Sequence, residues 1–139
     1  MAANTIPIFV KTPDLTSASI NAANTARDGS GTLVTLFTAG ADGSRVDYIV
    51  FTSAQPSVAA SSARVVRVFI TDTSGNNPRL RVEAAMTAVT ASNTVVGATT
   101  TITFTNGLLL ASGQQIKVSQ SVYASASDQT DVFAHGGDY

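Results

Sequence analysis

Short runs of β-branched and aromatic residues, set off by glycine, asparagine and proline turns, recur along the whole sequence. Two of these runs, residues 79–86 and 115–123, alternate apolar and polar side chains with a period of two. Such alternation directs one row of side chains into a core and the other into solvent. No segment shows the i, i+3, i+4 apolar spacing of an amphipathic helix. The pattern therefore predicts an all-β chain folded as an antiparallel β-sandwich or barrel.

The pattern divides the chain into roughly seven to nine strands. Residues 15–26 are compatible with either a strand or a short helical turn, and Asp42-Gly43 is a dipeptide typical of a hairpin. Turns or loops are expected at residues 12–14, 27–31, 54–62 and 72–78. Strands are expected at residues 32–38, 45–52, 64–71, 79–86, 99–105, 115–123 and 131–134, with a short apolar segment at 108–110.

The run at residues 64–71 is the strongest strand signal, because apolar side chains fall on both of its faces. A strand that is apolar on both sides is typical of a central position in a sheet. One face would then lie in the core and the other against a neighbouring molecule. This run therefore favours a multimer.

The expected strand count and the length of 139 residues suit a single eight-stranded jelly roll, which consists of two Greek keys. An immunoglobulin-type sandwich is the alternative, but its Cys–Trp–Cys signature is missing. A chain of this size buries about 65–70 % of its unfolded surface, so its core needs no disulfide. We expect residues 1–12 to form an N-terminal arm or edge strand and residues 13–139 to form one β-sandwich domain.

The charge balance argues against several classes of partner. Only 12 % of the residues are charged and the net charge is −1, so no basic surplus is present for nucleic acid. No apolar run is long enough to span a bilayer, and the N-terminus lacks the pattern of a signal peptide. The surface is instead rich in short Ala, Ser and Thr side chains, which lose little entropy when they pack against other subunits.

The sequence offers little chemistry. It has no cysteine, a single histidine, His135, and a single glutamate, Glu83. A catalytic His135 would need a serine nucleophile, and no G-x-S-x-G elbow is present, so we predict a solvated or interface histidine and no enzyme. The run from Asp72 to Gly75 is interpreted as a loop. No cofactor or metal site is predicted, although loop aspartates leave a calcium ion as an alternative.

Four arginines on adjacent predicted strands form a possible acid-binding patch: Arg64, Arg67, Arg79 and Arg81. The favoured interpretation is cross-strand pairing with Asp47, Asp72 or Glu83.

Four segments carry a resemblance to known proteins: residues 22–32 (AANTARDGSGT), 34–46 (VTLFTAGADGSRV), 64–70 (RVVRVFI) and 136–139 (GGDY). With these segments the chain resembles a group of small proteins encoded by tailed bacteriophages and prophages, whose chains look like single jelly-roll modules. The resemblance covers nearly the whole chain and is weak between residues 76 and 97. None of its motifs is catalytic.

The resemblance implies a structural role in the virion. Small jelly rolls of phage heads often act as decoration, or cement, proteins, which sit as trimers on the outer capsid surface and clamp neighbouring capsomers. The expected partners are thus the major capsid protein and further copies of this chain, with neither nucleic acid nor membrane. The expected location is the phage head surface, after synthesis in the cytoplasm of the bacterial host.

The N-terminal arm is the predicted partner-binding segment. Its apolar residues could fill pockets while its main chain adds a strand to a neighbour's sheet, or the arm could be the first strand of its own sandwich. The residues concerned are Ile6, Ile8, Phe9 and Val10. Two other virion roles stay open. One is a tail-tip or fibre module that binds host glycans through aromatics such as Tyr48, Tyr123 or Tyr139, and the other is a tail-tube or minor coat protein.

Overall fold

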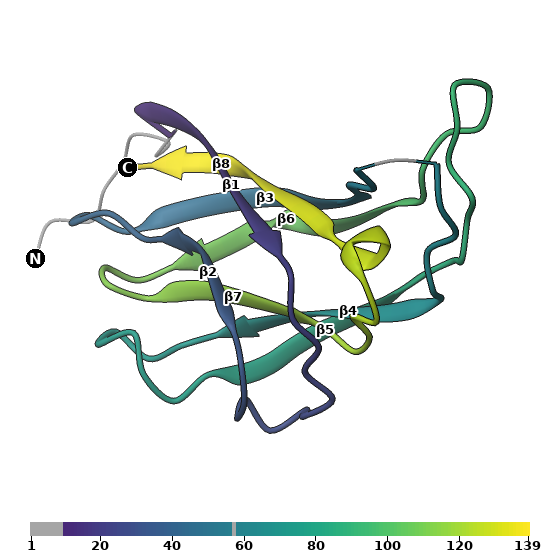
Figure 1. Cartoon of the computed structure of the whole chain (residues 1–139). Coiled ribbons are helices and arrows are strands. Elements are labelled where there is room, and N and C mark those ends of the chain that lie inside the picture. Colours follow the sequence, from purple (N-terminus) through teal and green to yellow (C-terminus); the bar gives the residue numbers. More distant parts are fainter. Residues whose placement is uncertain (1–9, 57) are drawn as a thin grey trace, which may run out of the picture.

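The computed structural model describes residues 10–56 and 58–139 and contains two four-stranded antiparallel sheets packed face to face (Figure 1). Sheet A has the order β1-β8-β3-β6, and sheet B has the order β2-β7-β4-β5. Sheet A consists of β1 (Thr12–Ile20), β8 (Thr130–Asp138), β3 (Ser44–Ser53) and β6 (Thr99–Leu110). Sheet B consists of β2 (Val34–Thr38), β7 (Gln115–Gln120), β4 (Arg64–Ile70) and β5 (Arg79–Met86). A single turn of 3-10 helix, η1 (Ala126–Asp128), precedes β8.

The strand pairing is that of a long hairpin rolled up on itself. The first strand pairs with the last, β2 with β7, β3 with β6, and β4 with β5. Two further pairings, β3 with β8 and β4 with β7, join these strand pairs into the two four-stranded sheets. This arrangement confirms the predicted eight-stranded jelly roll.

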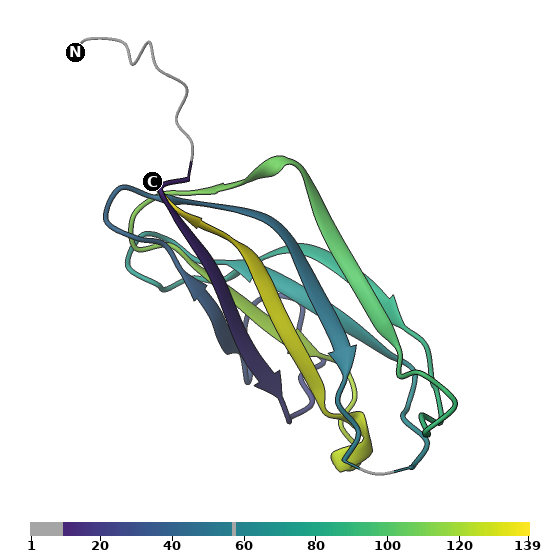
Figure 2. The same cartoon turned by 90° about the horizontal axis from the view of Figure 1, so that it is seen from above.

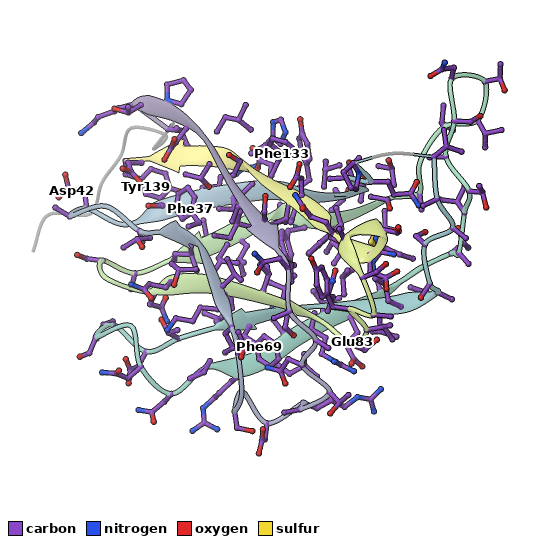
Figure 3. All side chains as sticks on the ribbon, in the orientation of Figure 1. Phe37, Asp42, Phe69, Glu83, Phe133 and Tyr139 are labelled. Carbon is purple, nitrogen blue, oxygen red and sulfur yellow. The ribbon has the colours of Figure 1, made fainter. Side chains whose placement is uncertain are left out.

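The core lies between the sheets and follows the period-two pattern of the sequence. Ile102, Ile116 and Val118 point inward, as predicted, and are buried, while Phe104 packs against the same core. The aromatic members of the core include Phe37 and Phe51, and Figure 3 shows Phe37 between the two layers. Burying each such side chain contributes about 1.5–3 kcal/mol to stability.

One predicted turn is wrong, and a second forms but does not have the predicted role. Residues 12–14 belong to β1, because an edge strand tolerates Pro13, whose missing N–H can face away from the ladder. The Asp42-Gly43 turn does not close a hairpin, since β2 lies in sheet B and β3 in sheet A. It carries the chain from one layer to the other, with Gly43 at a φ of 88° and its N–H donating to the Gly40 carbonyl.

The second face of β4 is also explained differently from the prediction. Arg67 and Phe69 point away from the core, yet they are 5 % and 0 % exposed. Residues 21–33, which we call the strap, cross this outer face of sheet B. The strap begins beside Gln120 at the end of β7, and its Gly29 packs closely against the Pro78 carbonyl just before β5. The chain itself therefore covers the second apolar face, and no neighbour is needed.

Candidate interaction surfaces

An ion-pair network fixes the strap to sheet B. Arg67 donates from Nε to Glu83 Oε1 at 2.6 Å and from Nη1 to the Asn24 carbonyl at 2.8 Å. Arg27 of the strap donates to the same Glu83 oxygen at 3.1 Å. The hydrogen bond from Arg67 lowers the pKa of the Glu83 carboxyl below its usual 4.5, against the opposing effect of burial. The outer face of sheet B is thus closed by its own chain, and we call it the sealed face.

The strap is also folded within itself. Asn24 donates from Nδ2 to the carbonyls of Ser30 and Thr32, both at 2.9 Å, and its Oδ1 accepts from the Ala26 N–H. This single buried side chain organises the turn predicted at residues 27–31. Its position in an Ala- and Asn-rich segment gave no sequence signal.

The four arginines do not form one patch. The predicted pairing with Glu83 is confirmed for Arg67 alone, whereas Arg64 lies on the inner side of β4 and is 3 % exposed. Arg64 donates from Nε to Thr130 Oγ1 at 3.0 Å and from Nη1 to the Ser62 carbonyl at 2.9 Å. Its Nη1 also lies 3.9 Å from the carboxylate of Asp128, a partner that the sequence analysis missed. The sequence did contain a signal for the burial of Arg64, because the residue has the same period-two phase as the inward valines of β4.

This buried pair joins two loops, residues 54–63 and 121–129. Burial raises the pKa of Asp128, but hydrogen bonds from the Ser62 and Ala124 N–H groups and the nearby Arg64 outweigh it, so the net pKa lies below its usual value. Burial likewise lowers the pKa of Arg64, with attraction to Asp128 opposing. Both charges have several polar partners and serve to hold the loops together.

Three loops, of which these are two, form an end of the sandwich that is nearly free of charge, which we call the neutral end. They are residues 54–63, 87–98 and 121–129, and Asp128, only 1 % exposed, is their sole charged residue. The opposite end carries Lys11, Asp42, Asp72, Arg79 and Asp138. Contact at the neutral end therefore requires no charge to be desolvated.

One loop of the neutral end projects beyond the strands, as Figures 1 and 2 show. We call residues 87–98 the finger. Its base is fixed because Ser61 donates its N–H to the Val89 carbonyl at 2.8 Å, while Gln55 bonds both Val89 and Ala91. Its tip turns tightly, with Ser92 and Val95 exchanging backbone hydrogen bonds. Hydrogen bonds at its base and tip thus hold the finger in a defined hairpin-like conformation.

The outer face of sheet A is uncovered in the described part of the chain, and we call it the open face. In its register Leu15 neighbours His135, which neighbours Tyr48, and the next row places Phe133 beside Val50. Leu15 is 60 % exposed. Figure 3 shows Phe133 on the opposite side of sheet A from the core residue Phe37. Threonines of β6 complete this face with short side chains.

His135 is part of the open face. Its ring stacks on Tyr48 with centroids 4.2 Å apart, and its Nδ1 lies 3.0 Å from the Tyr48 hydroxyl. This partner is a phenol, and neither a serine nor a carboxylate of a triad fills that position. Asp14 and Asp47 line a shallow hollow beside the stacked rings.

The predicted loop at residues 72–78 is confirmed and has a structural explanation. The carboxylate of Asp72 accepts hydrogen bonds from the Ser74 and Asn76 N–H groups and from the Asn77 side chain, and these bonds, led by that of Asn76, lower its pKa. Residues 10–56 and 58–139 contain no cluster of three or more His, Cys, Asp or Glu side chains suited to a metal ion. Within the same ranges no helix combines the length and apolarity required to cross a bilayer.

Most of the predicted arm lies outside the described residues, namely Ile6, Ile8 and Phe9. Val10, the first described residue, lies beside Gly137, and the Lys11 N–H donates to the Asp138 carbonyl at 2.9 Å. The described chain thus begins alongside β8 at the end opposite to the neutral end.

Comparison with known proteins gave few matches. No family model matches the chain, and no curated protein matches its sequence. Among solved structures, a chain in the structure of the infectious bursal disease virus Gt strain shares 16 % identity, with a TM-score of 0.31, over 98 % of this chain and 34 % of its own length. A chain of the Gx strain gives 14 % identity and a TM-score of 0.34 over 99 % of this chain and 36 % of its own length. The chain thus spans about a third of these neighbours, and at such TM-scores they carry no argument about function.

Proposed function

We propose that this protein is a structural component of a tailed-phage virion, a head decoration protein that binds the outer surface of the capsid. The observation that carries the proposal is the contrast between the two sheet faces. The sealed face is closed by an ion-paired strap, whereas the open face presents Leu15, a Tyr48–His135 stack and a row of threonines. The resemblance to small phage proteins supports the same role.

The open face is suited to a flat protein surface. Stacking holds two of its rings together, and its threonines are short and stiff, so ordering these side chains on contact costs little entropy. Its aromatic groups provide anchors of the kind that dominate binding energy in interfaces. The major capsid protein is the proposed partner.

The role is tested by counting copies in purified virions with quantitative mass spectrometry. A decoration protein should be present at a copy number comparable with that of the capsid subunits. Particles that lack it should also lose resistance to heat. A count of only a few copies per particle would contradict the proposal.

The binding surface is tested with capsids assembled without the protein. Val50→Lys places a charge in the centre of the open face and should abolish capsid binding. Leu80→Asp, a substitution of a partly exposed leucine on sheet B, is the matched control and should leave binding intact. If both variants bind like the natural protein, another surface is used.

The predicted arm is tested in the same assay. Deletion of residues 2–10 should abolish capsid binding while the sandwich stays folded, if the arm adds a strand to a capsid subunit. Retained binding would assign the contact to the open face alone.

One observation favours a second role, that of a glycan-binding adhesion module. The hollow beside the Tyr48–His135 stack combines an aromatic ring with the carboxylates of Asp14 and Asp47, groups that together can hold a sugar. A glycan array would show binding that is lost in Asp47→Ala. Absence of binding across the array would eliminate this alternative.

A further inference from the structure

We infer that the neutral end is a self-association surface, in which Val96 of one copy occupies a depression on a second copy. This inference concerns contacts between copies and does not depend on capsid binding. It begins with exposure at the tip of the finger, where Val96 is 87 % and Val95 is 46 % exposed. Two adjacent valines on a projecting hairpin form an apolar knob that the monomer leaves in water.

A depression lies between the finger and the loop of residues 54–63 on the same end. It has a volume of about 300 Å³ and is lined by Gln55, Val58, Ala91, Ser92 and Asn93. Val58 is itself 67 % exposed, so the depression offers an apolar wall. Gln55 fixes the other walls. Its side-chain amide donates hydrogen bonds to the Ala59 and Val89 carbonyls and accepts one from the Ala91 N–H. Knob and depression are therefore both shaped before association.

The chemistry of this end favours a second copy as the occupant. The three loops contain no charged residue except the buried Asp128, so two such ends can meet without desolvating or opposing a charge. One molecule carries both the knob and the depression, which is the requirement for contact between identical chains related by rotation. The loops also supply about as many residues as the roughly 20–30 a side found in a standard interface.

Association at the neutral end leaves the open face uncovered in every copy. The assembled protein would then present several open faces at once, which raises the avidity of binding to any repeated surface. Because Val96 has few contacts within its own molecule, its substitution should not affect folding.

The test is the mass of the purified full-length protein, measured by light scattering during size-exclusion chromatography without capsids. The natural protein should be an oligomer. Val96→Asp should raise its dissociation constant at least about 30-fold, as expected for loss of a central contact. Ala91→Lys, which fills the depression, should do the same. Leu109→Asp, at a leucine that is 65 % exposed away from the neutral end, should leave the mass unchanged.

Mixing the two disruptive variants gives the sharper result. Val96→Asp keeps the depression and Ala91→Lys keeps the knob, so a mixture can form one contact without opposing like charges and should produce a dimer although each variant alone is monomeric. Circular dichroism checks that each variant is folded. A monomeric natural protein, an unchanged mass in Val96→Asp, or a mixture that stays monomeric would overturn the inference. Because the measurement contains no capsid, its outcome is independent of the proposed virion role.

Discussion

The outer faces of the two four-stranded sheets of this jelly roll are completed in different ways. On sheet B the strap crosses the strands, and Arg67, Glu83 and Arg27 join strap to sheet. On sheet A the described chain has no equivalent cover, and Leu15 and the Tyr48 ring stay in contact with solvent. An apolar side chain on the sealed face therefore acts on stability, whereas one on the open face is available for binding.

The largest expected effect is a difference in stability loss between variants of two phenylalanines that both point away from the core. Phe69→Ala should destabilise the protein by about 3 kcal/mol, because the ring is completely buried on the face that the strap crosses. Phe133→Ala on the open face should cost about 1 kcal/mol, since this ring is only partly buried. Denaturation by urea measures both. Equal losses in the free energy of unfolding would mean that the strap gives the outer face of sheet B no more burial than the outer face of sheet A has.

The next effect concerns the attachment of the strap. Arg67→Ala should cost about 2 kcal/mol, because it leaves the Asn24 carbonyl without its charged donor and the Glu83 carboxylate with Arg27 alone. Hydrogen exchange should then increase selectively in residues 21–33. The exposed Arg81 of the same sheet is the control, and Arg81→Ala should change stability by less than about 0.5 kcal/mol. A uniform increase in exchange across the whole protein would argue against local release of the strap.

A smaller effect is the pH dependence that Glu83 contributes. Its pKa is lowered in the folded protein by hydrogen bonding from Arg67, so its stabilising contribution is complete above the usual value of 4.5. The contribution should disappear as the pH falls through the lower, folded value. Asp28, Asp72 and Asp128 also have lowered pKa values, so the measured quantity is the difference between the natural protein and Glu83→Gln. The stability difference between these two proteins should shrink on acidification, and a difference that grows would contradict the assignment.

The smallest effect on stability is expected on the open face. Leu15→Thr removes an exposed leucine from an edge strand and should change the free energy of unfolding by less than about 0.5 kcal/mol. The same substitution should weaken capsid binding in the assay described above. A stability loss above about 1 kcal/mol would indicate that this face already has a cover within the chain.

The sequence predicted the elements that depend on local pattern. Period two correctly directed Ile102 and Phe104 inward and Thr101 and Thr103 outward, and the spacing of the turns correctly indicated a jelly roll. These features could be predicted because a one-residue slip would expose the whole apolar row.

The sequence did not predict features that depend on distant partners. Arg64 pairs with Asp128, and Arg67 binds a strap that precedes it by about forty residues, so no local spacing could indicate either contact. From the sequence alone, the apolar second face of β4 therefore indicates contact with a neighbouring molecule. The neutral end was visible in the sequence as loops without charge, but only the fold brings those three loops together.

The central claim, that the open face is the contact surface of a virion protein, is tested most directly by hydroxyl-radical footprinting of the free and the capsid-bound protein. We predict that Leu15 and Tyr48 become protected on binding while Leu80 on sheet B keeps its labelling rate. Protection of Leu80 with no change at Leu15 and Tyr48 would contradict the claim.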